Sequence, residues 1–103
     1  MDRRLQATLG RLPARPGVYL LRGTRDEVLY VGKAQDLRSR VRSYWQRQST
    51  AETHRIRSAI DRVADVEWTL TDSVSEALLL EANLIKRYRF EAQAHLKKPP
   101  NRG

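Results

Sequence analysis

Glu81 is the residue whose position is hardest to explain by folding alone. If residues 73–88 form a helix, its neighbours one turn away are all apolar: Ala77, Leu78, Leu84 and Ile85. The carboxylate then lies in the middle of an apolar stripe, where an unpaired charge is strongly unfavourable. It should therefore pair with a cation, bind a metal ion or face a cleft, and the pattern alone favours a structural ion pair with an arginine as much as a functional site.

Two tyrosines are expected to meet on one face of a β-hairpin. Residues 18–22 and 27–32 are rich in β-branched, leucine and tyrosine residues, and residues 23–26 between them contain glycine and aspartate. This pattern predicts two strands and a four-residue loop. The loop places Tyr19 directly opposite Tyr30, with Cβ atoms about 4.5–5.5 Å apart. An ordinary aromatic cross-strand pair is the alternative to two functional phenols, and a bulge would break the register.

Two cations stand near these groups. Gly32 and Lys33 follow at the end of the second predicted strand, where glycine lets a ligand approach the backbone and lysine supplies a positive charge. Arg40 lies one turn before Tyr44 at the edge of the next helix's apolar stripe, so its stem packs inward while its guanidinium reaches a groove. Each observation alone also fits everyday surface chemistry. In a functional site, Glu81 and the two phenol hydroxyls should line one concave patch.

The remaining sequence supplies the elements that would position these side chains. Capping residues and helical periodicity predict helices at residues 2–12, from Asp36 to Trp45, from Thr50 or Ala51 to Val63, and from Ser73 to about Tyr88 or Phe90. Alternation of apolar and polar residues predicts a third strand from Val66 to Thr71. The fold class is therefore α+β, a small antiparallel sheet covered by helices. We assign residues 1–90 to one domain and residues 91–103 to a basic, poorly ordered tail.

Composition narrows the function classes. The 103 residues suit one domain, and their net charge of +8 favours polyanionic partners: DNA, RNA or an acidic membrane surface. With no cysteine, disulfides, zinc–thiolate sites and cysteine nucleophiles are excluded. The sequence shows no signal peptide and no apolar run of membrane-spanning length, so we expect a cytoplasmic monomer with no membrane partner. His54 and His95 are expected at the surface, and Trp45 and Trp68 in the core.

Three segments together resemble the GIY-YIG nuclease superfamily. They are Pro16-Gly17-Val18-Tyr19, then Tyr30-Val31-Gly32-Lys33-Ala34, then Asp36-Leu37-Arg38-Ser39-Arg40. The stretch from Glu76 to Lys86, EALLLEANLIK, is more narrowly similar to the N-terminal endonuclease domains of UvrC proteins from bacterial nucleotide excision repair. The resemblance covers roughly residues 12–89. It implies a three-stranded antiparallel sheet flanked by helices and a site on one sheet face.

The resemblance also implies roles and partners. Glu81 would hold one divalent ion, Mg²⁺ or Mn²⁺, directly or through its water shell. Tyr19 and Tyr30 would be the site tyrosines, one of which orients or deprotonates the attacking water; we favour Tyr30 because it is nearer Lys33. Arg40 would neutralise the scissile phosphate, and Lys33 would support the tyrosines or the phosphate. The implied partners are DNA and, if the chain is part of a UvrC, a UvrB-like repair protein.

One departure bears on activity. Where the family continues into a proline and a tyrosine–asparagine pair, this chain has Phe90, Ala92 and Gln93, so the family's asparagine is missing. Gln93 is an imperfect substitute. The leading hypothesis is a structure-selective DNA nickase that makes the 3′-side incision. The alternatives are a DNA-binding or scaffold module of the same fold with little turnover, and a small basic RNA-binding protein.

Overall fold

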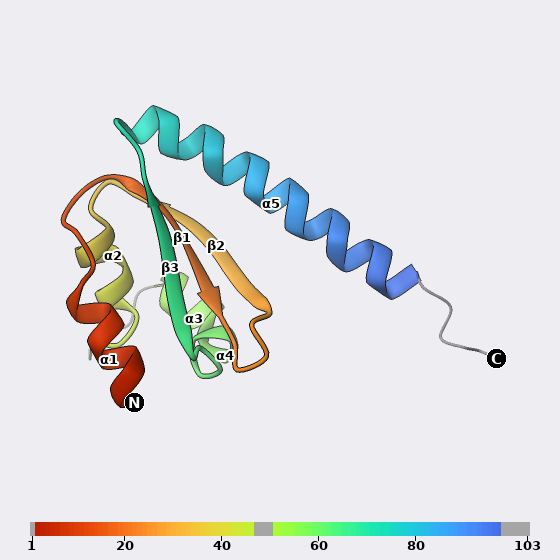
Figure 1. Ribbon diagram of the computed structural model, residues 1–103, viewed down its shortest axis with the longest axis horizontal. Coiled ribbons are helices and arrows are strands. Elements are labelled where there is room, and N and C mark those ends of the chain that lie inside the picture. The colour runs from red at the N-terminus through yellow and green to blue at the C-terminus, as the bar shows by residue number, and fades with distance from the viewer. Residues whose placement is uncertain (1, 47–50, 98–103) are drawn as a thin grey trace.

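The computed structural model describes residues 2–46 and 51–97, and the side chains of residues 2–46 and 51–89. Its elements, in chain order, are α1 (Arg3–Gly10), β1 (Gly17–Arg22), β2 (Val28–Ala34), α2 (Leu37–Ser43), α3 (Ala51–Arg55), α4 (Arg57–Ile60), β3 (Asp65–Leu70) and α5 (Val74–Lys97). Within these residues the sheet has three antiparallel strands in the order β2-β1-β3. Figure 1 shows α5 on one side of the sheet and α1 to α4 on the other. The predicted α+β class is confirmed.

The hairpin differs from the prediction in its register. Tyr19 lies opposite Gly32, and Tyr30 lies opposite Leu21. The pairing is shifted because Glu27 belongs to the loop and a bulge follows Leu21. The predicted direct pairing of Tyr19 with Tyr30 is therefore wrong. The shift is two residues, an even number, so the two side chains still point to the same face.

The turn itself accounts for the extra loop residue. The amide of Asp26 donates to the carbonyl of Gly23 at 3.0 Å, and the amide of Gly23 donates to the carbonyl of Glu27 at 2.9 Å. Asp26 has a φ of 64°, a left-handed conformation that aspartate tolerates better than most residues. A loop over residues 23–27 therefore replaces the predicted four-residue loop.

The sheet is buried on both faces, in two separate apolar clusters. Tyr19, Leu21 and Ala34 pack with α1, α2 and the α3–α4 segment, and Trp45 and Trp68 pack against the same cluster as partly buried side chains. Val18 and Val31 point the other way, where Ala77 of α5 completes a smaller cluster. Neighbouring residues of one strand thus belong to different clusters.

The predicted starts of the helices agree with the structure better than their predicted lengths do. The Asp36 side chain accepts from the amide of Ser39 at 3.1 Å and begins α2 as predicted. The single helix predicted up to Val63 is two short helices, α3 and α4, and its predicted start at Thr50 lies outside the described residues. In α5, the amide of Glu76 donates to Ser73 Oγ at 3.1 Å, but the Glu76 carboxylate accepts from the amide of Asp72.

The last helix extends beyond its predicted end. We placed that end near Phe90, whereas α5 continues to Lys97. The added residues include alanine, leucine, glutamine and glutamate, which favour helices, and the next proline is Pro99. Residues 91–97, which we assigned to the basic tail, therefore belong to α5, and residues 98–103 lie outside the described part of the chain.

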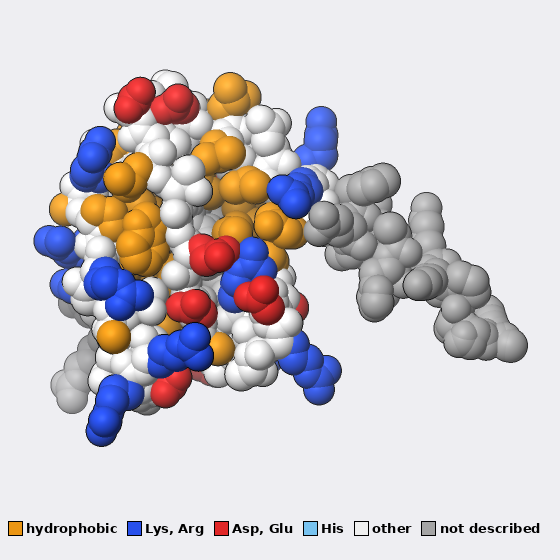
Figure 2. Space-filling model, in the orientation of Figure 1, with side chains coloured by type: hydrophobic (Ala, Val, Ile, Leu, Met, Phe, Trp, Pro, Cys, Tyr) orange, Lys and Arg blue, Asp and Glu red, His pale blue; other side chains and the backbone are white. Residues whose placement is uncertain are grey.

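The surface of the described residues is mixed in character. On the face drawn in Figure 2, Lys and Arg side chains are spread around the margin with carboxylates among them, and an apolar area lies between. None of the helices described here combines the length and apolar character needed to cross a membrane.

Candidate active site at the outer edge of β2

The ring of Tyr19, on the central strand, occupies the space over Gly32, its partner on β2, which has no side chain. Tyr19 is 1% exposed, and a Cβ added at Gly32 would collide with the ring. The Tyr19 and Tyr30 rings lie 6.2 Å apart between centroids. The tyrosines of the two sequence motifs therefore share one face although they are diagonal neighbours.

A third tyrosine joins this pair from α2. Tyr44, the residue that follows the helix, is 1% exposed, and its hydroxyl lies in a short hydrogen bond with the hydroxyl of Tyr19. Its ring centroid lies 6.1 Å from that of Tyr19. The sequence placed Tyr44 only in an apolar stripe, so the structure adds a member to the predicted site.

Glu52 connects these phenols to Arg40. One carboxylate oxygen, Oε2, accepts from the hydroxyl of Tyr30 at 3.1 Å and from that of Tyr44 at 2.9 Å. The other oxygen, Oε1, accepts from Arg40 Nη1 in a short ion pair. Sequence reasoning missed Glu52, because its partners lie 8, 12 and 22 residues away and no local pattern marks it. We call Tyr19, Tyr30, Tyr44, Arg40 and Glu52 the tyrosine cluster.

The hydrogen bonds fix the direction of the protons in this cluster. A phenol has one proton to donate, and Tyr44 donates its proton to Glu52. In the bond between the two buried phenols, Tyr19 must therefore be the donor and Tyr44 the acceptor. The protons of all three phenols thus point, directly or through Tyr44, toward one carboxylate.

Burial and this carboxylate make the phenols weaker acids. Burial raises the pKa of Tyr19 and of Tyr44 well above the usual value, and the negative charge of Glu52 adds to both effects. Burial also raises the pKa of the more exposed Tyr30, again with a contribution from Glu52, although a hydrogen bond with Arg55 opposes it. For Tyr19, the nearby Arg40 opposes the rise in pKa, but burial outweighs it.

Lys33 and Glu81 form a second group, which we call the lysine–glutamate pair. Lys33 Nζ lies 3.9 Å from Glu81 Oε1, and the two side chains are 41% and 18% exposed. The carboxylate in the apolar stripe is thus partly buried and paired, as predicted, but its partner is a lysine.

The two groups lie on opposite faces of β2. Tyr30 belongs to the face packed by α1 to α4, whereas Lys33 reaches α5. The expected single patch is therefore two groups, one on each side of the strand at Gly32. Among the described residues β2 pairs on one side only, with β1. Both groups thus border the same edge, the outer edge of β2, and an extended ligand along it would meet both.

Two hollows open onto this edge. One is lined by Arg40 and Glu52 together with four polar residues: Gln35, Asp36, Ser39 and Ser43. The other lies between β2 and α5 and includes Tyr30, Tyr88 and Arg89. The first hollow therefore gives solvent and ligands a route to Arg40.

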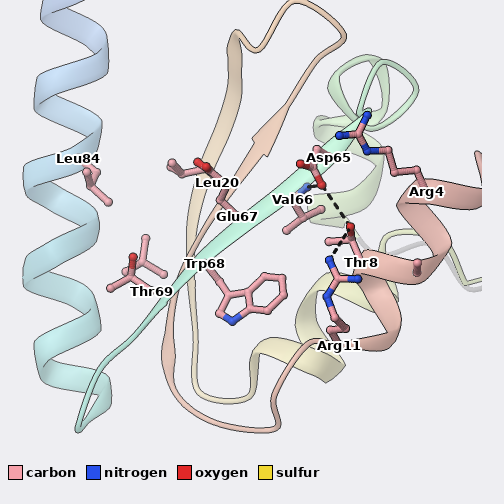
Figure 3. A pocket seen from close by; sticks show the side chains of 12 residues that line it. Arg4, Thr8, Arg11, Leu20, Asp65, Val66, Glu67, Trp68, Thr69 and Leu84 are labelled. Atoms are coloured by element: carbon pink, nitrogen blue, oxygen red, sulfur yellow. Dashed lines mark hydrogen bonds between the residues drawn. The ribbon is translucent and has the colours of Figure 1, made fainter.

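A larger hollow than these two lies elsewhere, along β3. Figure 3 shows Arg4 and Thr8 of α1, with Arg11 just after that helix, at one end of it and Leu84 of α5 at the other. Thr8 Oγ1 donates to Asp65 at 3.3 Å and accepts from Arg11 at 3.4 Å. The residues that line it include none of the five predicted site residues.

The sheet order, the α5 packing and the facing tyrosines define a class of domain, the GIY-YIG fold. The chain belongs within it to the UvrC-like GIY-YIG domain family, whose model matches residues 15–91. The N-terminal endonuclease domain of UvrC from Thermotoga maritima, solved with its catalytic magnesium, superposes with a TM-score of 0.73 and 31% identity, covering 86% of this chain and 94% of that one.

The relatives are much longer than this chain. The UvrABC system protein C of Clostridium tetani is 50% identical over 86 residues, which are 84% of this chain and 14% of that protein. The corresponding protein of Acaryochloris marina is 49% identical over 94 residues, 91% of this chain and 15% of its own length. The chain thus spans about one seventh of these relatives.

Proposed function

We propose that this domain is a metal-dependent DNA endonuclease that hydrolyses one phosphodiester bond, as the 3′-side incision of nucleotide excision repair. The observation that carries the proposal is that an arginine and two phenols converge on one face of β2, while Lys33 on the other face of the same strand pairs with Glu81 of α5. Membership of the UvrC-like family and the magnesium-bound relative support it. The proposed partners are DNA and a UvrB-like protein, and the proposed compartment is the cytoplasm.

The donor set at Glu81 fits a magnesium ion that keeps most of its water. Among the described residues no three His, Cys, Asp or Glu side chains gather into a metal-binding group. Mg²⁺ commonly uses one or two carboxylates, several waters and substrate phosphate oxygens. Glu81 offers one partly exposed carboxylate with Lys33 beside it, so Glu81 would hold the ion and DNA would complete its shell.

Each remaining residue has a role that its surroundings support. When bound, the metal would stabilise charge on the phosphoryl oxygens and promote ionisation of water. Arg40 would hold the scissile phosphate, and Lys33 would support it from the α5 side. Tyr30, the more exposed of the two motif tyrosines, would accept a proton from the attacking water in its phenolate form, after releasing its own proton to solvent. The buried Tyr19 would position Tyr44.

A DNA-binding module with little turnover is the second candidate. The ion pair between Arg40 and Glu52 favours it, because an arginine already neutralised stabilises less of the charge that develops on the phosphate during hydrolysis. The substitution of the family's asparagine, at the sequence level, points the same way.

The experiment compares the wild-type protein with Glu81→Gln on nicked, bubbled and lesion-bearing duplexes in Mg²⁺ and in Mn²⁺. Glu67→Gln is the matched control, since the carboxylate of this β3 residue pairs with Arg22 of β1. We expect nicking to fall at least about 100-fold in Glu81→Gln alone, and Mn²⁺ bound to the apo-protein, followed by electron paramagnetic resonance, to be lost with it. Equal nicking by all three proteins would indicate a contaminating nuclease. Retained DNA binding without nicking would favour the module.

A further inference from the structure

The Glu52 carboxylate has the bonding pattern of a bound phosphate. It receives a guanidinium N–H on one oxygen and two phenol O–H groups on the other. Arginine and hydroxyl donors around a two-oxygen anion are also the usual partners of a phosphodiester. Under the proposed function, Arg40 and Tyr30 act on the scissile phosphate, so Glu52 holds the donors that the substrate needs.

This contact is accessible from solvent. The Arg40 and Glu52 side chains are 46% and 26% exposed. Both line the polar hollow with Ser39 and Ser43, so a phosphate could reach Arg40 from that side. Ion pairs with such exposure are weak and are screened by salt. The bond between Arg40 and Glu52 is therefore one that a DNA phosphate can replace.

We propose that Glu52 is an internal stand-in for the DNA phosphate, which orders Arg40, Tyr30 and Tyr44 in the free domain and must give way when DNA binds. The inference rests on the proposed function. Two anions do not share one set of donors, because their repulsion adds to the loss of hydrogen bonds. Glu52 thus keeps the donors in place and at the same time opposes DNA binding.

The first test measures DNA affinity without metal, so that no cutting occurs. Glu52→Gln is compared with Glu67→Gln, and each substitution changes the net charge from +8 to +9. The amide introduced by Glu52→Gln retains an oxygen that accepts from the phenols. We expect Glu52→Gln to bind a nicked duplex about three- to tenfold more tightly than Glu67→Gln does, and this gain to disappear when Arg40 is also changed to Gln. Equal affinity of the two Gln variants, or weaker binding by Glu52→Gln, would overturn the proposal.

The second test adds inorganic phosphate to the wild-type protein and to the same two Gln variants. The side-chain Nε–Hε signal of Arg40 and the Cδ signal of Glu52 are followed by NMR as phosphate is added at low salt. We expect the two signals to move together, and Glu52→Gln to reach half-saturation at several-fold lower phosphate than Glu67→Gln. Phosphate that perturbs the Arg40 signal while the Glu52 signal stays unchanged would contradict displacement.

The two proposals fail separately. Absence of metal-dependent nicking, with competition between phosphate and Glu52 intact, would count against the endonuclease alone. Metal-dependent nicking with indistinguishable Glu52→Gln and Glu67→Gln proteins would count against the stand-in alone.

Discussion

The ring of Tyr19 lies on the backbone of Gly32, its direct partner across the β1–β2 pair. A Cβ at residue 32 would overlap that ring in a buried, closely packed region. We therefore expect Gly32→Ala to lower the free energy of unfolding by about 1–3 kcal/mol, the usual cost of overpacking. Denaturation in urea measures the change. Gly10→Ala is the control, because no described atom lies within 4 Å of its added Cβ, and unfolding of both variants at the wild-type midpoint would contradict the packing described here.

The two buried phenols should behave as a unit. Tyr44→Phe leaves the Tyr19 hydroxyl without its acceptor, and Tyr19→Phe removes the donor. We expect each single variant to lose about 1–3 kcal/mol and the double variant to lose less than their sum, with a coupling of about 0.5–3 kcal/mol. A double-mutant cycle in urea gives this quantity, and strict additivity would show that the hydroxyls do not interact in solution.

Alkaline pH should destabilise the fold through the same phenols. The pKa values of Tyr19 and Tyr44 in the folded protein are raised above the unfolded value of about 10. Above pH 10 the unfolded chain therefore binds fewer protons, and the free energy of unfolding falls with rising pH, by about 1.4 kcal/mol per pH unit for each phenol. Below pH 10 this contribution is fully present. Thermal melts from pH 8 to 11 should show a shallower decline for Tyr19→Phe, and parallel curves would refute the assignment.

Nicking should depend on pH through Tyr30. Its pKa is raised, above all by burial, so the deprotonated phenol is scarce at neutral pH. We expect the single-turnover rate to rise about tenfold per pH unit from pH 7 to 9 without a plateau. Tyr30→Phe should lower the rate about 100- to 10,000-fold, the usual contribution of acid–base catalysis. A variant that keeps the wild-type rate and pH profile would exclude Tyr30 as the base.

Lys33 should compete with metal for Glu81. Its ammonium lies 3.9 Å from the carboxylate, so its removal frees Glu81 for a cation. We expect Lys33→Met to bind Mn²⁺ about two- to fivefold more tightly, a shift of about 0.4–1 kcal/mol, in the range of an exposed ion pair. Lys86→Met, on an exposed part of α5, controls for the loss of one positive charge. Equal effects of the two substitutions would indicate a general charge effect.

Local patterns predicted much of this architecture. Strand alternation and caps located the sheet, α2 and the start of α5, because these signals depend on residues a few positions apart. The apolar stripe predicted that Glu81 would be partly buried and paired. The prediction that Tyr19 and Tyr30 share one face of the sheet is correct although the predicted register is wrong. A shift by an even number of residues keeps both side chains on the same side.

What the sequence did not predict depends on tertiary contacts. Glu52 can be assigned to the site only through its hydrogen bonds with Tyr30, Tyr44 and Arg40, and these residues come close to it only in the folded chain. The division of the site between two faces follows from the packing of α5 over Val18 and Val31. The contacts of Glu52 leave no mark in the spacing of the residues concerned, whereas the odd separation of Tyr30 and Lys33 on one strand already places them on opposite faces.

The packing of α5 against its own face of the sheet makes the domain modular. The tyrosine cluster is anchored in the core shared by β1, α1 and α2, whereas Glu81 is carried by α5, which meets the sheet through the small cluster around Ala77. Under the proposed function, a change that loosens this interface would displace the metal ligand Glu81. It would leave Arg40, the proposed phosphate ligand, in place. The packing of α5 on the sheet thus decides whether the domain cuts DNA or only binds it. Substitutions at this interface are therefore the simplest way to convert one function into the other.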